Sequence, residues 1–214
     1  MPDTLHVGAI EFALERLEKE LDSRLVYHGV AHTRDSVLPA ADRLGRLAGL
    51  SAENHLILTT AAAYHDIGFI IQRDGHEAAG CIIARETLPR FGYTPPQIEH
   101  ICQTIMATRL PQTPVDLVGE LMADADLDVL GRDDLWETMQ LLYCEWRNFG
   151  QWTTDEAFKA GQLAFISGHS YFSDAAKQLR NKSKQCNLAT IVERFADPQT
   201  VLGLPNGQYR LSLE

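Results

Sequence analysis

The chain has 214 residues, 45% of them hydrophobic, with 19 Lys and Arg residues against 29 Asp and Glu residues. That length suits one domain, or two small ones, whose core needs neither disulfides nor a structural metal. A net charge of −10 argues against a dedicated nucleic-acid binder, because such a protein needs a basic face for phosphates. We therefore expect no nucleic-acid polymer as a partner.

The sequence also lacks signals for membranes and for an oxidising compartment. It has no uncharged apolar run of about 18 residues or more, and its N-terminus lacks the basic-then-apolar pattern of a signal peptide. The cysteines, Cys81, Cys102, Cys144 and Cys186, are scattered and form no CxxC pair. We interpret them as free, mostly buried thiols, and we expect a cytoplasmic protein with no membrane partner.

Helical signals recur along the whole chain. Apolar residues between Ile10 and Leu25 have the spacing of an amphipathic helix over residues 6–25. Further helices are predicted over residues 31–49, 51–66, 75–91, 94–108, 113–130 and 133–150, then from Thr153 onward, and over 169–180 and 187–196. The pattern predicts an all-α fold: one compact bundle of about nine to ten helices.

Several helix ends carry specific signals. Ser51 and Thr94 are candidate N-caps, and Thr153 with Glu156 fits a capping box. Pro39 lies inside the second helical pattern, so that helix is kinked there or begins later. In the tail, apolar residues flank a Pro-Asn-Gly turn over residues 201–213, which is compatible with a short hairpin.

His28 and His32 stand four residues apart, which places both imidazoles on one face if the segment is helical. Gly29 and Tyr27 instead favour a loop at His28, with His32 opening the following helix. The pair is then one metal ligand and a neighbour, or two polar residues at a helix start.

His65-Asp66 closes the apolar helix predicted over residues 51–66. Adjacent helical residues point about 100° apart, so they meet at one atom only from the side or at a helix end. A carboxylate there faces the negative end of the helix dipole, and the apolar residues around it, such as Ile67 and Phe69, would bury it. A divalent cation would offset both the unfavourable helix dipole and the burial of the charged carboxylate. The alternative is a plain His-Asp hydrogen bond at a helix end.

Asp124, Asp126 and Asp128 form a third cluster among apolar residues. A spacing of two splits carboxylates across helix faces, so at most one of Asp124 and Asp126 is expected to point into a given site. The alternative is a solvated acidic stripe.

Together these segments offer imidazoles and carboxylates from separate helices. That ligand type suits Mn²⁺, Fe²⁺, Zn²⁺, Ni²⁺ or, less readily, Mg²⁺. Such an ion activates a water molecule and polarises a phosphoryl oxygen. The sequence contains no P-loop, GxGxxG, GxSxG or HExxH motif, so nucleotide-loop and serine-hydrolase functions have no support.

These three segments resemble the HD superfamily of metal-dependent phosphohydrolases. The matching pieces are residues 27–33 (Tyr-His-Gly-Val-Ala-His-Thr), 63–68 (Ala-Tyr-His-Asp-Ile-Gly) and 123–127 (Ala-Asp-Ala-Asp-Leu), in the order of the family's H…HD…D pattern. The resemblance runs over residues 20–180. It implies an HD-type helical domain over residues 1–196, with residues 197–214 as a C-terminal tail.

The resemblance also implies a site in which one divalent metal ion is held by His32, His65, Asp66 and Asp126. We prefer Asp126 to Asp124 because the family's last ligand usually follows a small residue and precedes a leucine-like one, as in Ala125-Asp126-Leu127. Asp124 and His28 are then expected to orient ligands or a water.

Two further residues bear on the metal count and on the substrate. Gly75-His76-Glu77 resembles the segment from which some family members draw a His for a second metal, which makes His76 a candidate. Thr108 stands where another His of those members falls, so a single ion is expected. Arg109 is a candidate phosphate ligand through its bidentate fork, or else a surface arginine at a helix end.

The resulting hypothesis is a metal-dependent phosphohydrolase for a small phosphorylated molecule, with a nucleotide as the expected class. A metal-activated water attacks phosphorus, Arg109 offsets charge, and Asp66 or another nearby carboxylate handles the proton. The alternative is a regulatory module that keeps the HD fold and binds metal or nucleotide with little turnover. A plain helical scaffold is the third reading.

Overall fold

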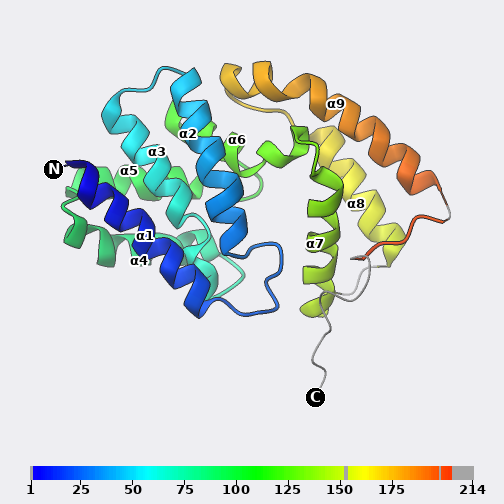
Figure 1. Ribbon diagram of the computed structural model, residues 1–214, viewed down its shortest axis with the longest axis horizontal. Coiled ribbons are helices and arrows are strands. Elements are labelled where there is room, and N and C mark those ends of the chain that lie inside the picture. The colour runs from blue at the N-terminus through cyan, green and yellow to red at the C-terminus, as the bar shows by residue number, and fades with distance from the viewer. Residues whose placement is uncertain (1, 152–153, 198, 204–214) are drawn as a thin grey trace. The chain divides into compact units, whose positions relative to one another are not determined.

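The computed structural model describes residues 2–151, 154–197 and 199–203, and this part of the chain is helical with no strand. The all-α expectation is therefore confirmed for the described residues. Their α-helices (Figure 1) are α1 (Pro2–Glu20), α2 (Leu38–Leu47), α3 (Ala52–Tyr64), α4 (His76–Thr87), α5 (Pro95–Met106), α6 (Leu117–Asp126), α7 (Leu135–Asn148), α8 (Asp155–Gly168) and α9 (Asp174–Ala196). A π-helical segment, η1 (His32–Val37), and three 3₁₀ turns, η2 (Ile67–Ile70), η3 (Leu88–Phe91) and η4 (Asp128–Gly131), complete the set. None of the described helices is both long and apolar enough to span a bilayer.

The chain forms two compact units. The first comprises the described parts of residues 1–22, 28–128 and 171–178, and the second those of residues 23–27, 129–170 and 179–214. In the second unit, the Phe158 ring of α8 contacts the rings of Tyr143 and Trp146 on α7, with centroids 5.0 and 5.5 Å apart. All the candidate site residues belong to the first unit.

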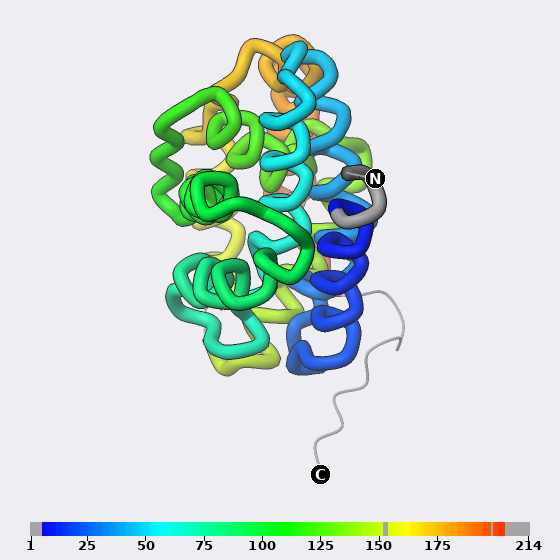
Figure 2. The backbone as a smooth tube through the Cα atoms, turned by 90° about the vertical axis from the view of Figure 1, so that its left-hand side faces the viewer, coloured from blue at the N-terminus to red at the C-terminus, as the bar shows by residue number. Residues whose placement is uncertain are grey.

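Helix α3 is the centre of the first unit. It contacts α1, α2, α4, α5 and α6, and the two backbone views show α2 and α3 side by side (Figures 1 and 2). Every residue from Ile57 to Tyr64 is buried. A helix that is apolar on all faces needs neighbours on all sides, and this need explains why α3 is central. His65 directly follows α3 and therefore also lies in the interior, where it is 1% exposed.

The prolyl residue inside the second helical pattern neither ends the helix nor delays its start. Helical backbone runs from Ala31 through η1 into α2, and Pro39 is in the first turn of α2. A proline ring clashes with the carbonyl four residues before it, and the wider π-helical turn ahead of Pro39 relieves that clash. The widened turn holds His32 as its first residue, buried.

Two predicted helix starts, at Ser51 and Thr94, are confirmed. Ser51 accepts a hydrogen bond from the Asn54 amide, and Thr94 forms a capping box with Gln97. The cap of α8 is Thr154, which accepts from the Ala157 amide, while Thr153 lies outside the described residues.

Other boundaries were predicted wrongly. Helix α1 ends at Glu20 rather than residue 25, because Asp22-Ser23 follows and such residues favour turns. Helix α6 begins at Leu117 rather than at residue 113, because the stronger cap Asp116 accepts from the Gly119 amide. The last two expected helices are one, α9, because residues 181–186 contain no Pro or Gly, and this helix begins at Asp174 rather than at residue 169. The suggested hairpin over residues 201–213 lies almost wholly outside the described residues.

Candidate metal centre

Four side chains from three separate parts of the chain converge in the first unit. His32 opens η1, His65 and Asp66 follow α3, and Asp126 ends α6. One ligand atom each of His32, His65 and Asp66 lies within 4.8 Å of the others. Oδ1 of Asp126 joins them, 3.1 Å from Nε2 of His32 and 3.5 Å from Nε2 of His65. The structure thus brings together all four residues that the sequence singled out as ligands.

The end of α3 explains how two adjacent residues reach the same point. His65 still has helical backbone angles, whereas Asp66 leaves the helix with φ −100° and ψ 0°. This change swings the Asp66 carboxylate round so that its Oδ2 lies 3.1 Å from Nε2 of His65 and 3.8 Å from Nε2 of His32. Within a regular helix the two side chains would diverge.

The donor atoms at this point fit a metal ion. Nδ1 of His65 lies 2.8 Å from the carbonyl oxygen of Ala62, and a proton donated there leaves Nε2 with a free lone pair. Nε2 of His65 and Oδ2 of Asp66 are buried, and among the described residues neither has a hydrogen bond, although they face each other at 3.1 Å. Buried polar atoms without partners are costly, and a divalent cation between them removes that cost.

His65 and the two carboxylates shift one another's pKa values. Burial by itself lowers the pKa of His65, but the carboxylates of Asp66 and Asp126 outweigh it and raise that pKa well above the usual value. Burial likewise opposes ionisation of Asp66 and Asp126, and the neighbouring imidazoles reverse this effect, so the pKa of each carboxyl is lowered. The carboxylates therefore stay ionised, as metal ligands must be.

A second imidazole lies on the other side of the Asp66 carboxylate. Nε2 of His76, in the first turn of α4, is 3.4 Å from Oδ1 of Asp66. Nδ1 of His76 faces the Arg73 carbonyl oxygen at 3.1 Å, which again leaves Nε2 for the site. The Phe69 ring stacks on His76 with centroids 3.8 Å apart and contacts the ring of His28 at 4.8 Å. His76 and His28 are thus both held against the Phe69 ring at the edge of the cluster.

The sequence reasoning missed Glu77 as a site residue. Glu77 is buried, and its Oε1 lies 3.8 Å from Nε2 of His76. An acidic residue next to a candidate histidine in the first turn of an apolar helix was the available signal, since buried carboxylates need a reason to be there.

Asp124 has contacts of a different kind. Its carboxylate accepts hydrogen bonds from the amides of Phe172 and Ser173, both at 2.8 Å, and from the Ser173 hydroxyl at 2.6 Å. Burial raises its pKa despite these bonds. Asp124 therefore anchors the segment that leads into α9, and a role in orienting metal ligands stays a prediction.

Arg109 lies just after α5 and is exposed. Within the described residues no side-chain contact ties it to the four ligands, so phosphate binding by Arg109 also stays a prediction. Thr108, which stands where a second-metal histidine was looked for, is buried and donates its hydroxyl proton to the Ile105 carbonyl.

Comparisons with known proteins bear on the fold. No family model matches the sequence, and no curated protein matches it. The chain is similar to the crystal structure of Bacillus subtilis YpgQ in complex with ADP, with a TM-score of 0.64 and 17% sequence identity, over 92% of this chain and 98% of that one. At this identity the likeness shows that the two chains share a fold.

Proposed function

We propose that this chain is a metal-dependent phosphohydrolase of the HD type, acting on a small phosphorylated substrate, with a nucleotide as the expected class. One observation carries the proposal: His32, His65, Asp66 and Asp126 meet at one point, where the buried atoms Nε2 of His65 and Oδ2 of Asp66 have no hydrogen bond among the described residues. The H…HD…D order of the sequence and the all-helical fold support it. That the similar YpgQ was crystallised with ADP supports a nucleotide as the substrate class.

In this proposal His32, His65, Asp66 and Asp126 hold one divalent ion of the Mn, Fe, Ni, Zn or Mg type. When bound, the ion lowers the pKa of a water molecule and polarises a phosphoryl oxygen. The Ala62 carbonyl keeps the His65 imidazole in the tautomer that presents Nε2 to the ion. His76, stacked on Phe69, sits beside the second oxygen of Asp66 and is available to a second ion or to the substrate.

The proton of the attacking water needs an acceptor, and two carboxylates are placed for it. Asp66 is our first assignment, although its lowered pKa makes it a better ligand than base. Glu77 is the other carboxylate beside His76. Arg109, exposed near the end of α5, is proposed to bind the substrate phosphate through its guanidinium fork.

Metal analysis with an activity screen tests the proposal. The purified protein should contain about one divalent ion per chain, and with Mn²⁺ or Ni²⁺ added it should release phosphate from nucleotides or phosphomonoesters, or open cyclic nucleotides. Asp66→Ala should lose both the ion and turnover. Asp74→Ala is a matched control, because Asp74 is exposed and eight residues along the chain. Unchanged turnover in Asp66→Ala would refute the mechanism.

The alternative is a regulatory module that binds metal or nucleotide with little turnover. Thr108 favours this alternative, because it stands where some family members have a histidine for a second metal. Its hydroxyl is instead bonded to the Ile105 carbonyl. Stoichiometric metal together with nucleotide binding, but without product across the whole screen, would support this module. Absence of bound metal would leave a helical scaffold.

A further inference from the structure

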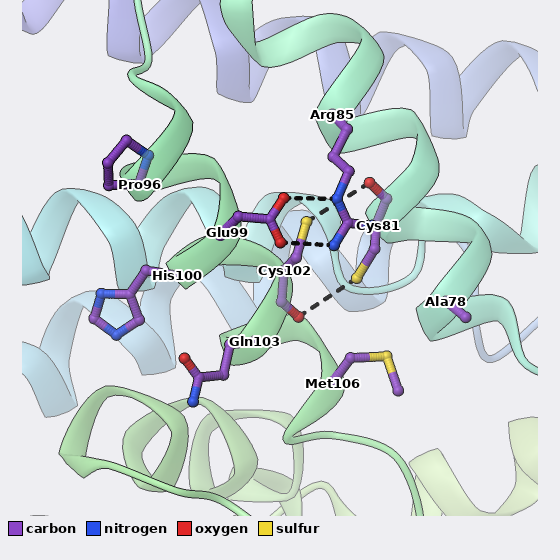
Figure 3. A pocket seen from close by; sticks show the side chains of 9 residues that line it. All are labelled: Ala78, Cys81, Arg85, Pro96, Glu99, His100, Cys102, Gln103 and Met106. Atoms are coloured by element: carbon purple, nitrogen blue, oxygen red, sulfur yellow. Dashed lines mark hydrogen bonds and ion pairs between the residues drawn. The ribbon is translucent and has the colours of Figure 1, made fainter.

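Helices α4 and α5 enclose a groove of about 530 Å³ that the proposed hydrolase chemistry does not use. Figure 3 shows its lining, which includes two cysteines, one from each helix. The thiol of Cys81 donates to the Cys102 carbonyl oxygen at 3.4 Å, and the thiol of Cys102 donates to the Cys81 carbonyl oxygen at 3.6 Å. Each is 3% exposed, so both lie at the floor of the groove.

A neighbouring ion pair fixes the register of the two helices at this point. Arg85, one turn after Cys81, makes a two-pronged bond to Glu99, one turn before Cys102, with N–O distances of 2.8 and 2.9 Å. Figure 3 shows this pair beside the thiols. Because neither helix can slide without breaking the bidentate contact, the cysteines are held opposite each other.

The two thiols differ in reactivity. The proximity of the Cys81 side chain, helped by the charge of Arg85, lowers the pKa of Cys102, whereas the proximity of Cys102 together with burial raises the pKa of Cys81. The thiolate is the reactive form of cysteine. In the proposal that follows, Cys102 is the attacking sulfur and Cys81 the second partner, and the single-cysteine variants test this order. Cys144 is part-buried and Cys186 is exposed on α9, so neither belongs to this groove.

We propose that Cys81 and Cys102 form a reversible, peroxide-sensitive dithiol that closes to a disulfide between α4 and α5. The Cys102 thiolate attacks a peroxide oxygen, the O–O bond breaks, and with one proton the products are a sulfenic acid and water. The Cys81 sulfur then attacks the sulfenic sulfur, and the S–O bond breaks as the S–S bond forms. The Cys81 proton leaves with the hydroxyl as a second water. One peroxide is reduced, two thiols are oxidised, and a dithiol reductant reverses the change. Intracellular disulfides of this kind are transient and redox-sensing.

Thiol counting on the intact protein tests the proposal. The full-length chain, as purified, is treated with hydrogen peroxide, alkylated, unfolded and assayed. Two of the four thiols should be lost and should return with dithiothreitol. Trypsin cuts after Arg73, Arg85, Arg90 and Arg109, so Cys81 and Cys102 fall in separate peptides, 74–85 and 91–109. A disulfide between these peptides is the expected product.

Variants separate the two roles. The double variant Cys144→Ser with Cys186→Ser should still lose two thiols, and it serves as the matched control. Cys81→Ala should stop at a sulfenic acid on Cys102 that dimedone traps, whereas Cys102→Ala should leave Cys81 unreacted. Arg85→Gln keeps both thiols and should slow their oxidation by peroxide several-fold. This variant tests the proposal even if an alanine variant fails to fold. Unreactive thiols in the folded protein, or a disulfide that maps to Cys144 or Cys186, would overturn the proposal.

Discussion

Gly68 lies so close to His76 that a Cβ built on Gly68 would be 1.8 Å from the carbonyl oxygen of His76 and 2.6 Å from the amide nitrogen of Gly80. Backbone therefore meets backbone where η2 crosses the start of α4. This approach places His76 beside the Asp66 carboxylate, two residues before Gly68 in the chain.

Gly68→Ala should be severely destabilising. The added methyl group clashes with backbone that no side-chain rotation can relieve, so η2 and α4 must separate, at a cost of about 3 kcal/mol or more. Urea denaturation measures this loss. Gly161→Ala is the control, because nothing lies within 4 Å of its Cβ and a helical Gly→Ala exchange in α8 should be neutral or stabilising by up to about 1 kcal/mol. Equal stability of the two variants would contradict the packing argument.

The metal-free protein should lose stability as pH rises above about 6.5. The pKa of His65 is raised in the folded state, so the stability due to its charge is complete below the unfolded value of about 6.5 and is lost as pH rises through the folded value. Melting temperatures in EDTA should fall across this window. Added metal should stabilise more at the higher pH, because it binds the deprotonated imidazole.

The control for that titration is the variant His65→Gln, which removes the imidazole. In EDTA its melting temperature should lack the fall that the wild type shows above about pH 6.5. A melting temperature of the metal-free protein that rises steadily from pH 6 to 8 would show that the sign is wrong.

Asp124→Ala should destabilise the protein without emptying the metal site. The variant leaves the Phe172 and Ser173 amides without their acceptor, which costs about 2 to 3 kcal/mol. Metal content per folded chain should stay near the wild-type value, whereas Asp126→Ala should lose the ion. Elemental analysis after gel filtration distinguishes the two variants. Loss of metal in a folded Asp124→Ala protein would instead support the ligand-orienting role that the family resemblance implies.

Glu77→Gln should reveal which carboxylate takes the proton. The amide keeps the size of the side chain but cannot accept a proton from water, so if Glu77 is the base, kcat should fall by about a hundredfold or more with metal content unchanged. The readout is kcat at saturating metal, compared with Glu86→Gln on the exposed side of α4. Wild-type turnover in Glu77→Gln would exclude Glu77 as the proton acceptor and leave Asp66 in that role.

Arg109→Gln should weaken binding of the substrate phosphate. Loss of a charge-assisted hydrogen bond is worth about 1.5 kcal/mol, so kcat/KM should fall about tenfold. Arg90→Gln, at another exposed arginine, is the control. Identical kinetics of the two variants would make Arg109 a surface residue, as the second interpretation of the sequence has it.

The sequence by itself determined the fold class, and with the family resemblance it named His32, His65, Asp66 and Asp126 as candidate ligands. Helical periodicity, with caps such as Ser51 and Thr94, specified most elements, because caps and apolar spacing are local properties of the chain. The pairing of His65 with Asp66 at a helix end already required a cation or a hydrogen-bond partner. Where two local signals competed, as between Thr113 and Asp116, only the folded backbone decided which one starts the helix.

Tertiary structure alone decided which carboxylates face the imidazoles. Asp124 and Asp126 have nearly the same local sequence, yet Asp124 accepts bonds from residues 172 and 173 whereas Asp126 lies against His32 and His65. The same holds for His76 beside Asp66 and for the thiols of Cys81 and Cys102 across two helices. These relations depend on how helices far apart in the sequence pack together. The periodicity of a single helix does not identify the helices that pack against it.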